Sequence, residues 1–195
     1  MKLRYELALI VLFLTSNWAP GRAQPAPALS GVWTFNRAES EIPQQVGFRA
    51  ALGPGGQMPS AGSPGRGGGP DQFQFDEKKD PRIDELTNEA QNPSPLLTIK
   101  QTDSDIRFVD SQGRIRTFRA TGQKQTQQLS SGTVESSARW DGSRLVTEYD
   151  LGGGRKVIYT YVLAQPKRLV VLVKFESRGA ATLVTEVYDA VSGQQ

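Results

Sequence analysis

The chain has no cysteine and no histidine among its 195 residues. Without cysteine it can form no disulfide and offers no thiolate nucleophile or thiolate metal ligand, so its stability must come from a hydrophobic core alone. Without histidine it lacks the side chain that titrates near neutral pH, which removes most general-base, pH-switch and metal-ligand roles. We therefore expect a protein that is not an enzyme and that has neither a cofactor nor a metal site.

Long apolar runs are also absent, apart from one near the N-terminus. Residues 7–14 form an unbroken apolar stretch, and the sequence Gly-Arg-Ala at residues 21–23 then offers small residues where a signal peptidase cleaves. The stretch is shorter than the roughly 20 residues of a membrane-spanning helix. The pattern predicts a signal peptide over residues 1–23, cleavage near Ala23, and an extracytoplasmic (periplasmic or secreted) mature chain without a transmembrane segment.

A strong excess of charge is missing too. The formal net charge is +3, and the predicted signal peptide carries three of the basic residues but only one acidic residue. The mature chain is therefore nearly neutral, which gives it no electrostatic attraction to nucleic acid or to acidic membranes.

What remains, residues 24–195, is long enough for one domain. A short strand pattern at residues 31–35 is followed by a long irregular stretch whose middle, residues 52–70, is rich in glycine, proline and serine. Such a composition buries too little apolar surface to offset the entropy of ordering, so we expect a flexible, disordered insert over about residues 41–80. A short polar helix is predicted at about residues 81–90, with Asp80 as its N-cap.

The second half of the chain has the pattern of an antiparallel β-meander. Alternation is clearest at residues 134–140, where Val134, Ala138 and Trp140 share one face. The pair Asp141-Gly142 favours a two-residue hairpin turn, and residues 145–150 alternate again. Turn signals recur every 8–12 residues. We predict an all-β domain of about eight strands, with a ninth candidate at residues 124–129, arranged up and down as a barrel or a sandwich.

Short motifs add two resemblances to known proteins. Gly31-Val32-Trp33 resembles the Gly-x-Trp of lipocalins and related calycin barrels, in which the Trp plugs one end of the barrel. That resemblance implies structural roles for Gly31 and Trp33. The chain also resembles a group of exported bacterial proteins of unknown function, which share the motifs found here at residues 29–33, 36–40, 140–142 and 187–189.

Five aromatic residues on neighbouring predicted strands are the candidate binding residues. They can fill the core, which a barrel of about eight strands is able to do completely, or they can line a cavity for one small apolar ligand. The five are Trp140, Tyr149, Tyr159, Tyr161 and Phe175.

The later strands also carry apolar residues on both faces, so some outward ones must be covered by the insert or by a partner. Together these features predict an exported lipocalin-like protein that binds a small hydrophobic or amphipathic ligand. The alternative is a non-catalytic interaction or structural protein of the cell envelope, with an envelope protein as its partner.

Overall fold

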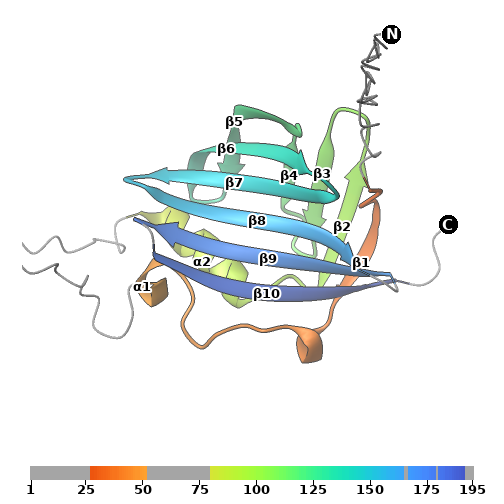
Figure 1. Ribbon diagram of the computed structural model, residues 1–195, viewed down its shortest axis with the longest axis horizontal. Helices are drawn as coiled ribbons and strands as arrows, with labels where there is room; N and C mark the ends of the chain where they lie inside the picture. The colour runs from red at the N-terminus through yellow and green to blue at the C-terminus, as the bar shows by residue number, and fades with distance from the viewer. Residues whose placement is uncertain (1–26, 52–79, 165–166, 179, 192–195) are drawn as a thin grey trace, which may run out of the picture.

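Ten antiparallel strands form one sheet in the computed structural model, which describes residues 27–51, 80–164, 167–178 and 180–191. The sheet curls into a nearly closed barrel (Figure 1). Its strands are β1 (Gly31–Phe35), β2 (Leu96–Gln101), β3 (Ile106–Asp110), β4 (Ile115–Phe118), β5 (Thr121–Leu129), β6 (Gly132–Asp141), β7 (Arg144–Gly152), β8 (Arg155–Ala164), β9 (Arg168–Ser177) and β10 (Ala180–Ala190).

The order of the strands decides between the two predicted architectures. Strand β1 pairs with β2 on one side and with β10 on the other, so the ladder runs without a break from β4 through β1 and β10 to β5. Strands β4 and β5 are the two edges of the sheet, and Gln127 of β5 donates a 2.5 Å hydrogen bond to the carbonyl of Thr117 in β4. The up-and-down meander is therefore a barrel and not a sandwich.

The strand count exceeds the predicted eight or nine. The ninth candidate lies inside β5, a full strand of nine residues, and β4 is only four residues long. Strand β5 has the sequence TGQKQTQQL and exposes most of its side chains, so its alternation of apolar and polar residues is weak. A period-two pattern identifies a strand only where one face is buried against a core.

The predicted hairpin after β6 forms one residue later than expected. Asp141 pairs with Arg144 as the last rung of the ladder, which leaves Gly142 and Ser143 as the two turn residues. Gly142 has a φ of +60°, and Asp141 instead joins Arg144 through an ion pair of 2.6 Å. Because Asp141 pairs with Arg144 in the ladder, the turn lies one residue further along the chain.

Part of the predicted flexible insert is packed on the sheet. Glu41 forms a β-bridge with Thr185 of β10, and helix α1 (Phe48–Ala51) follows the short 3-10 helix η1 (Arg37–Glu39). Phe48 is 2% exposed and meets Phe175 of β9 edge to face, with ring centroids 5.4 Å apart. The predicted flexible range therefore starts too early in the sequence, because residues 41–51 are packed on the sheet. Residues 52–79 of that range lie outside the described residues.

The predicted short helix is confirmed as α2 (Pro81–Gln91). The carboxylate of Asp80 caps it by accepting a 3.1 Å hydrogen bond from the backbone N–H of Arg82, and Pro81 occupies the first turn. Ile83, Leu86 and Ala90 are buried. The helix lies behind β9 and β10 in Figure 1 and covers one side of the barrel interior.

Gly31 and Trp33 meet at the start of β1. Trp33 is 5% exposed, and its indole N–H donates a 3.2 Å hydrogen bond to the carbonyl of Leu29. A Cβ on Gly31 would lie 3.3 Å from the indole nitrogen, so a larger residue would require the ring to shift by a few tenths of an ångström. This contact gives a physical reason for the Gly-x-Trp spacing.

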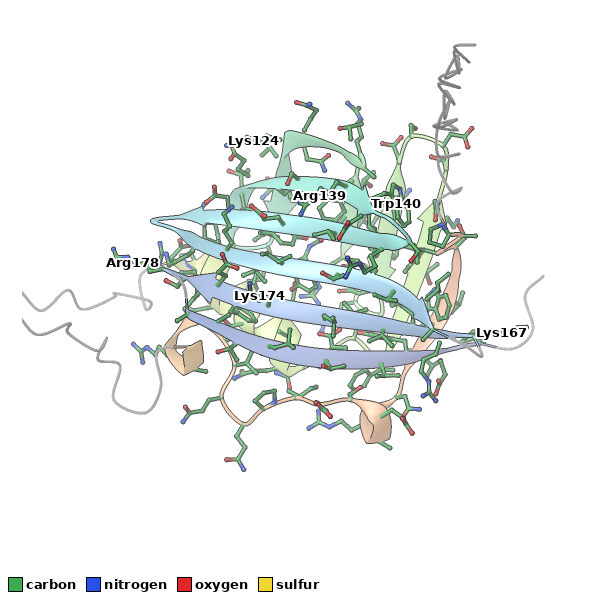
Figure 2. All side chains as sticks on the ribbon, viewed as in Figure 1. Lys124, Arg139, Trp140, Lys167, Lys174 and Arg178 are labelled. Atoms are coloured by element: carbon green, nitrogen blue, oxygen red, sulfur yellow. The ribbon has the colours of Figure 1, made fainter. Side chains whose placement is uncertain are left out.

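The outer face of the barrel carries charged and apolar side chains side by side. Figure 2 shows Lys124, Arg139 and Lys174 on the outside of β5, β6 and β9. Two outward apolar residues of β10 differ in how far they are covered. Val187 is 5% exposed, and its backbone hydrogen-bonds to Asn36 and Ser40 in the segment after β1. Leu183 is 53% exposed. Coverage by the segment after β1 is thus partial.

Within the described ranges, no helix is both long and apolar enough to cross a membrane.

Candidate functional site

A cavity of about 90 Å³ lies inside the barrel. Inward-pointing residues of β2, β3, β4, β7, β8, β9 and β10 surround it, because alternate side chains of each strand face the interior. Glu89 of α2 and the segment that follows this helix complete the lining. The lining falls into an aromatic part, a charged part, and a buried carboxyl group between them.

The aromatic part is the tyrosine wall, formed by Tyr149 of β7 and by Tyr159 and Tyr161 of β8. The rings of Tyr149 and Tyr159 meet edge to face at 5.8 Å, and those of Tyr159 and Tyr161 stack at 6.3 Å. Phe108 adds a further ring 4.8 Å from Tyr161. Burial raises the pKa of Tyr149 to about 12 and that of the other two hydroxyls well above their usual value, so all three stay protonated at neutral pH.

One hydroxyl of this wall has no partner. The Tyr159 hydroxyl is fully buried, and no group in the described part of the chain hydrogen-bonds to it. A buried hydroxyl without a hydrogen bond costs about 1–3 kcal/mol. A polar group of a bound molecule, or a water, would recover that loss.

The charged part is the arginine rim, formed by Arg114 and Arg116 with the carboxylates of Glu89 and Asp110. Arg116 of β4 donates two hydrogen bonds to Glu89 of α2, of 2.7 and 2.6 Å, and lies 3.6 Å from Glu85. Burial opposes the charge of Arg116, but the electrostatic effects of Tyr149 and Glu89 outweigh it and raise its pKa. The guanidinium therefore stays charged and ties α2 to the barrel wall.

Arg114 completes the rim from the turn between β3 and β4. It lies 2.8 Å from Glu89 and forms a very short hydrogen bond with Asp110. Burial by itself would raise the pKa of Asp110, but the hydrogen bond from Arg114 lowers it below the usual value. Each arginine of the rim is thus neutralised by carboxylates of the protein itself.

Helix α2 has a second anchor on the opposite side of the barrel gap. Glu85 accepts hydrogen bonds from the backbone N–H groups of Ser130 and Ser131, at 3.1 and 2.7 Å, in the turn between β5 and β6. Burial would raise the pKa of Glu85, but the bonds from Ser131 and Ser130 lower it. Glu85 and Glu89, one helical turn apart, therefore join α2 to β4 and to the β5–β6 turn.

The buried carboxyl group belongs to Glu186 of β10. It is 6% exposed, and within the described residues its one hydrogen bond comes from the hydroxyl of Tyr188, at 3.0 Å. Burial raises the pKa of Glu186 to about 8. The hydrogen bond from Tyr188 opposes this shift, and the nearby charge of Glu89 adds to it. Glu186 is therefore mostly neutral at pH 7 and ionises just above it.

The structure brings three of the five predicted binding residues together, namely Tyr149, Tyr159 and Tyr161 in the tyrosine wall. Phe175 is fully buried against Phe48 and lies outside the cavity lining. Trp140 lies near the C-terminal end of β6 (Figure 2). It borders a separate hollow of about 330 Å³, together with the exposed turn between β2 and β3. Their role in binding stays a prediction.

Sequence reasoning missed Glu186, Arg116 and Glu89. Glu186 carries a signal in hindsight, because it shares the inward parity of Val184 and Tyr188 along β10. A charged residue at an inward position is rarely fully buried without a partner, which marks it for attention. In the described part of the chain, no group of three or more acidic side chains is arranged as a metal ion would require.

No protein-family model and no curated protein matches the chain. Solved structures do match. Apo lipid binding protein 8 of Caenorhabditis elegans superposes with a TM-score of 0.52 and 11% identity, over 86% of this chain and 100% of that chain.

Two other structures align with lower scores. The "REP1-NXSQ fatty acid transporter" gives 0.49 at 16% identity, over 85% and 98% of the two chains, and zebrafish ileal bile acid-binding protein with cholic acid gives 0.48 at 11%, over 85% and 100%. The resemblance to exported bacterial proteins stays a prediction. Strand order and the superposition at 0.52 agree that the chain has a lipocalin-like, calycin-type β-barrel fold.

Proposed function

We propose that the chain is an exported, non-catalytic binding protein that holds a small hydrophobic or amphipathic ligand inside its barrel. The observation that carries this proposal is the cavity, which combines an apolar aromatic wall with a few converging polar groups. Ligand sites have this composition, because apolar walls supply affinity and a small number of polar groups fix the orientation.

The size of the cavity limits the ligand. Pockets for drug-sized molecules measure roughly 300–1,000 Å³, against about 90 Å³ here. The interior therefore accepts a small molecule or the head group of a longer one. Pro93 and Ser94, which follow α2, and Leu97 of β2 also line the cavity and are half-buried. The apolar tail of a longer ligand would leave the barrel between them.

The fold supports a ligand of this kind by analogy only. The structure that superposes at 0.52 is named a lipid binding protein. A fold does not fix a function, so this likeness supports the class of ligand and leaves its identity to the residues of the cavity.

The lining also favours binding over catalysis. Ser94 is its aliphatic hydroxyl, and it donates to the carbonyl of Leu96 at 2.7 Å and contacts the hydroxyl of Ser111 at 3.0 Å. Neither partner is a base that could activate it.

Export is supported by the sequence signals near the N-terminus. Cleavage near Ala23 removes no described residue, because the described residues begin at Pro27.

The test is a variant that fills the cavity. Val171 of β9 is 1% exposed and lines the cavity, whereas its neighbour Val170 points outward. In calorimetric titrations with 1-octanol, an uncharged amphiphile, we expect Val171→Phe to abolish binding and Val170→Phe to leave it unchanged. Octanol binding that survives in both variants contradicts the proposal, and so does an unaltered protein that binds no eight-carbon amphiphile, whatever its head group.

A second variant covers the case in which Val171→Phe does not fold. Leu97→Trp places a large ring at the half-buried opening of the cavity, where the structure has more room to adjust. We expect this variant to keep the β-sheet circular dichroism of the unaltered protein and to weaken octanol binding. A folded Leu97→Trp protein with unaltered affinity places the binding site elsewhere.

A further inference from the structure

We propose that the barrel selects a cationic amphiphile and holds its ammonium head group between the carboxylate of Glu186 and the tyrosine wall. This assignment rests on the proposed function, because it names the ligand class of that same cavity. It differs from a site for a carboxylate ligand, which would need a positive charge that is free to bind.

The arginine rim offers no such free charge. Both terminal nitrogens of Arg116 hydrogen-bond to Glu89, and Arg114 is shared between Glu89 and Asp110. A carboxylate ligand would have to displace a carboxylate of the protein from a partly buried pair, which is costly because it leaves that group without a partner.

Carboxyl groups outnumber arginines in the lining. Two arginines face three carboxyl groups, those of Glu89, Asp110 and Glu186, and Glu85 adds a fourth acidic group beside Arg116. The first two carboxylates are bound to the rim, so Glu186 is the carboxyl group of the lining without a cationic partner in the described residues. A bound ammonium group would supply that partner.

The surroundings of Glu186 suit a cation. Along the ladder its position is level with Val171 of β9, which is level with Tyr161 of β8, so the carboxylate faces the tyrosine wall across one small residue. Aromatic faces attract cations through the negative potential of the ring, and desolvation strengthens that attraction. The wall already holds one cation in this way, since the guanidinium carbon of Arg116 lies 5.7 Å from the ring centre of Tyr149.

The Tyr159 hydroxyl provides an independent indication that a polar group belongs in this cavity. It is more than nine-tenths buried, lines the same space, and has no hydrogen-bond partner. An ammonium N–H would donate to this oxygen and to the Glu186 carboxylate. The hydroxyl and the carboxylate would then both be satisfied by one small head group.

Three eight-carbon probes that differ only in the head group test the assignment, namely octylammonium, 1-octanol and octanoate. Titrations are made at about pH 8.5, where Glu186 is largely ionised and the amine is still protonated. We expect octylammonium to bind at least ~10-fold more tightly than octanol, as for a charged hydrogen bond in place of a neutral one, and octanoate to bind most weakly.

Two matched variants locate the preference. Glu186→Gln keeps the shape of the side chain and removes its charge, and we expect it to bring octylammonium and octanol to within ~3-fold of each other. Glu176→Gln makes the same change on β9 at an exposed residue that pairs with Lys174 and lies outside the cavity lining, so the preference should persist. If Glu186→Gln does not fold, Tyr159→Phe takes its place, with an expected loss of at least ~3-fold in octylammonium affinity.

The outcomes separate this assignment from the proposed function. Octanol or octanoate binding as tightly as octylammonium, or a preference that survives Glu186→Gln, overturns the cation assignment and leaves a cavity that binds neutral or anionic molecules. Failure of all three probes to bind contradicts the proposed function together with the assignment.

Discussion

Arg116 of β4 donates two hydrogen bonds, of 2.7 and 2.6 Å, to the carboxylate of Glu89 in α2, and this pair closes one side of the barrel interior. The arrangement joins a helix from the connection between β1 and β2 to an edge strand of the sheet. The pair therefore has two effects. It holds the helix in place, and it occupies the positive charge that would otherwise face a ligand.

Removing the arginine should destabilise the fold. Arg116→Gln leaves Glu89 beside a neutral partner, and breaking a buried pair of this kind costs about 3 kcal/mol of unfolding free energy. Arg119→Gln is the matched control, because Arg119 is 77% exposed and its ion pair with Asp105 is weak; its change should stay below ~0.5 kcal/mol. Urea denaturation measures both, and equal losses in the two variants contradict the role of the pair.

Stability should fall as pH rises toward 8. The pKa of Glu186 is raised to about 8 by burial, so between about pH 4.5 and 8 the folded chain keeps a proton that the unfolded chain has lost. Each pH unit in this window lowers the free energy of unfolding by up to ~1.4 kcal/mol, and the loss ends above the folded pKa. Asp80, Glu85 and Asp110 have lowered pKa values, so their effect on the free energy of unfolding falls at lower pH.

The variant Glu186→Gln isolates this effect. Its amide does not titrate, so its free energy of unfolding should be nearly constant between pH 5 and 8, as urea denaturation at several pH values would measure. The chain has no histidine to confuse the comparison. A slope as steep as that of the unaltered protein would show that another group titrates in this window.

Phe48 tests whether the segment before residue 52 belongs to the fold. Its ring is 2% exposed and packs on Phe175, so Phe48→Ala should leave a void and cost about 3–4 kcal/mol. Thermal unfolding measures the loss. Lys100→Ala, at an exposed position of β2, is the control and should have little effect. A Phe48→Ala protein as stable as the control would mean that residues 41–51 contribute no packing.

Export makes a prediction about the N-terminus of the mature chain. If a signal peptidase cleaves after Ala23, N-terminal sequencing of the protein from its cell envelope should start at Gln24. An Ala23→Arg variant places a large charged side chain at the cleavage position, and we expect it to accumulate as the uncleaved precursor. A mature protein that begins at Met1 contradicts the predicted signal peptide.

The antiparallel β-meander could be predicted because its strands bury one face. Alternation in β6 and β7, and the cap and proline of α2, are local signals that survive in three dimensions. Barrel and sandwich could not be separated, because that difference lies in the pairing of β1 with β10, between residues more than 150 positions apart. Local patterns carry no information on such a contact.

The site divides in the same way. The tyrosine wall could be predicted because its three residues are aromatic and lie at inward positions on adjacent strands. The arginine rim could not, since Glu89 and Arg116 come from a helix and a strand that only the fold brings together. Phe175 shares the aromatic pattern of the wall, but α1 covers it, so its place in the core depends on packing that no periodicity reveals.

Native mass spectrometry of the mature protein, purified from its own cell envelope, shows whether the barrel carries a small molecule. We expect a bound mass of a few hundred daltons that is lost in Val171→Phe and retained in Val170→Phe. A protein that carries no small molecule, or one that carries only another protein, contradicts a ligand-binding barrel and favours an interaction role in the envelope.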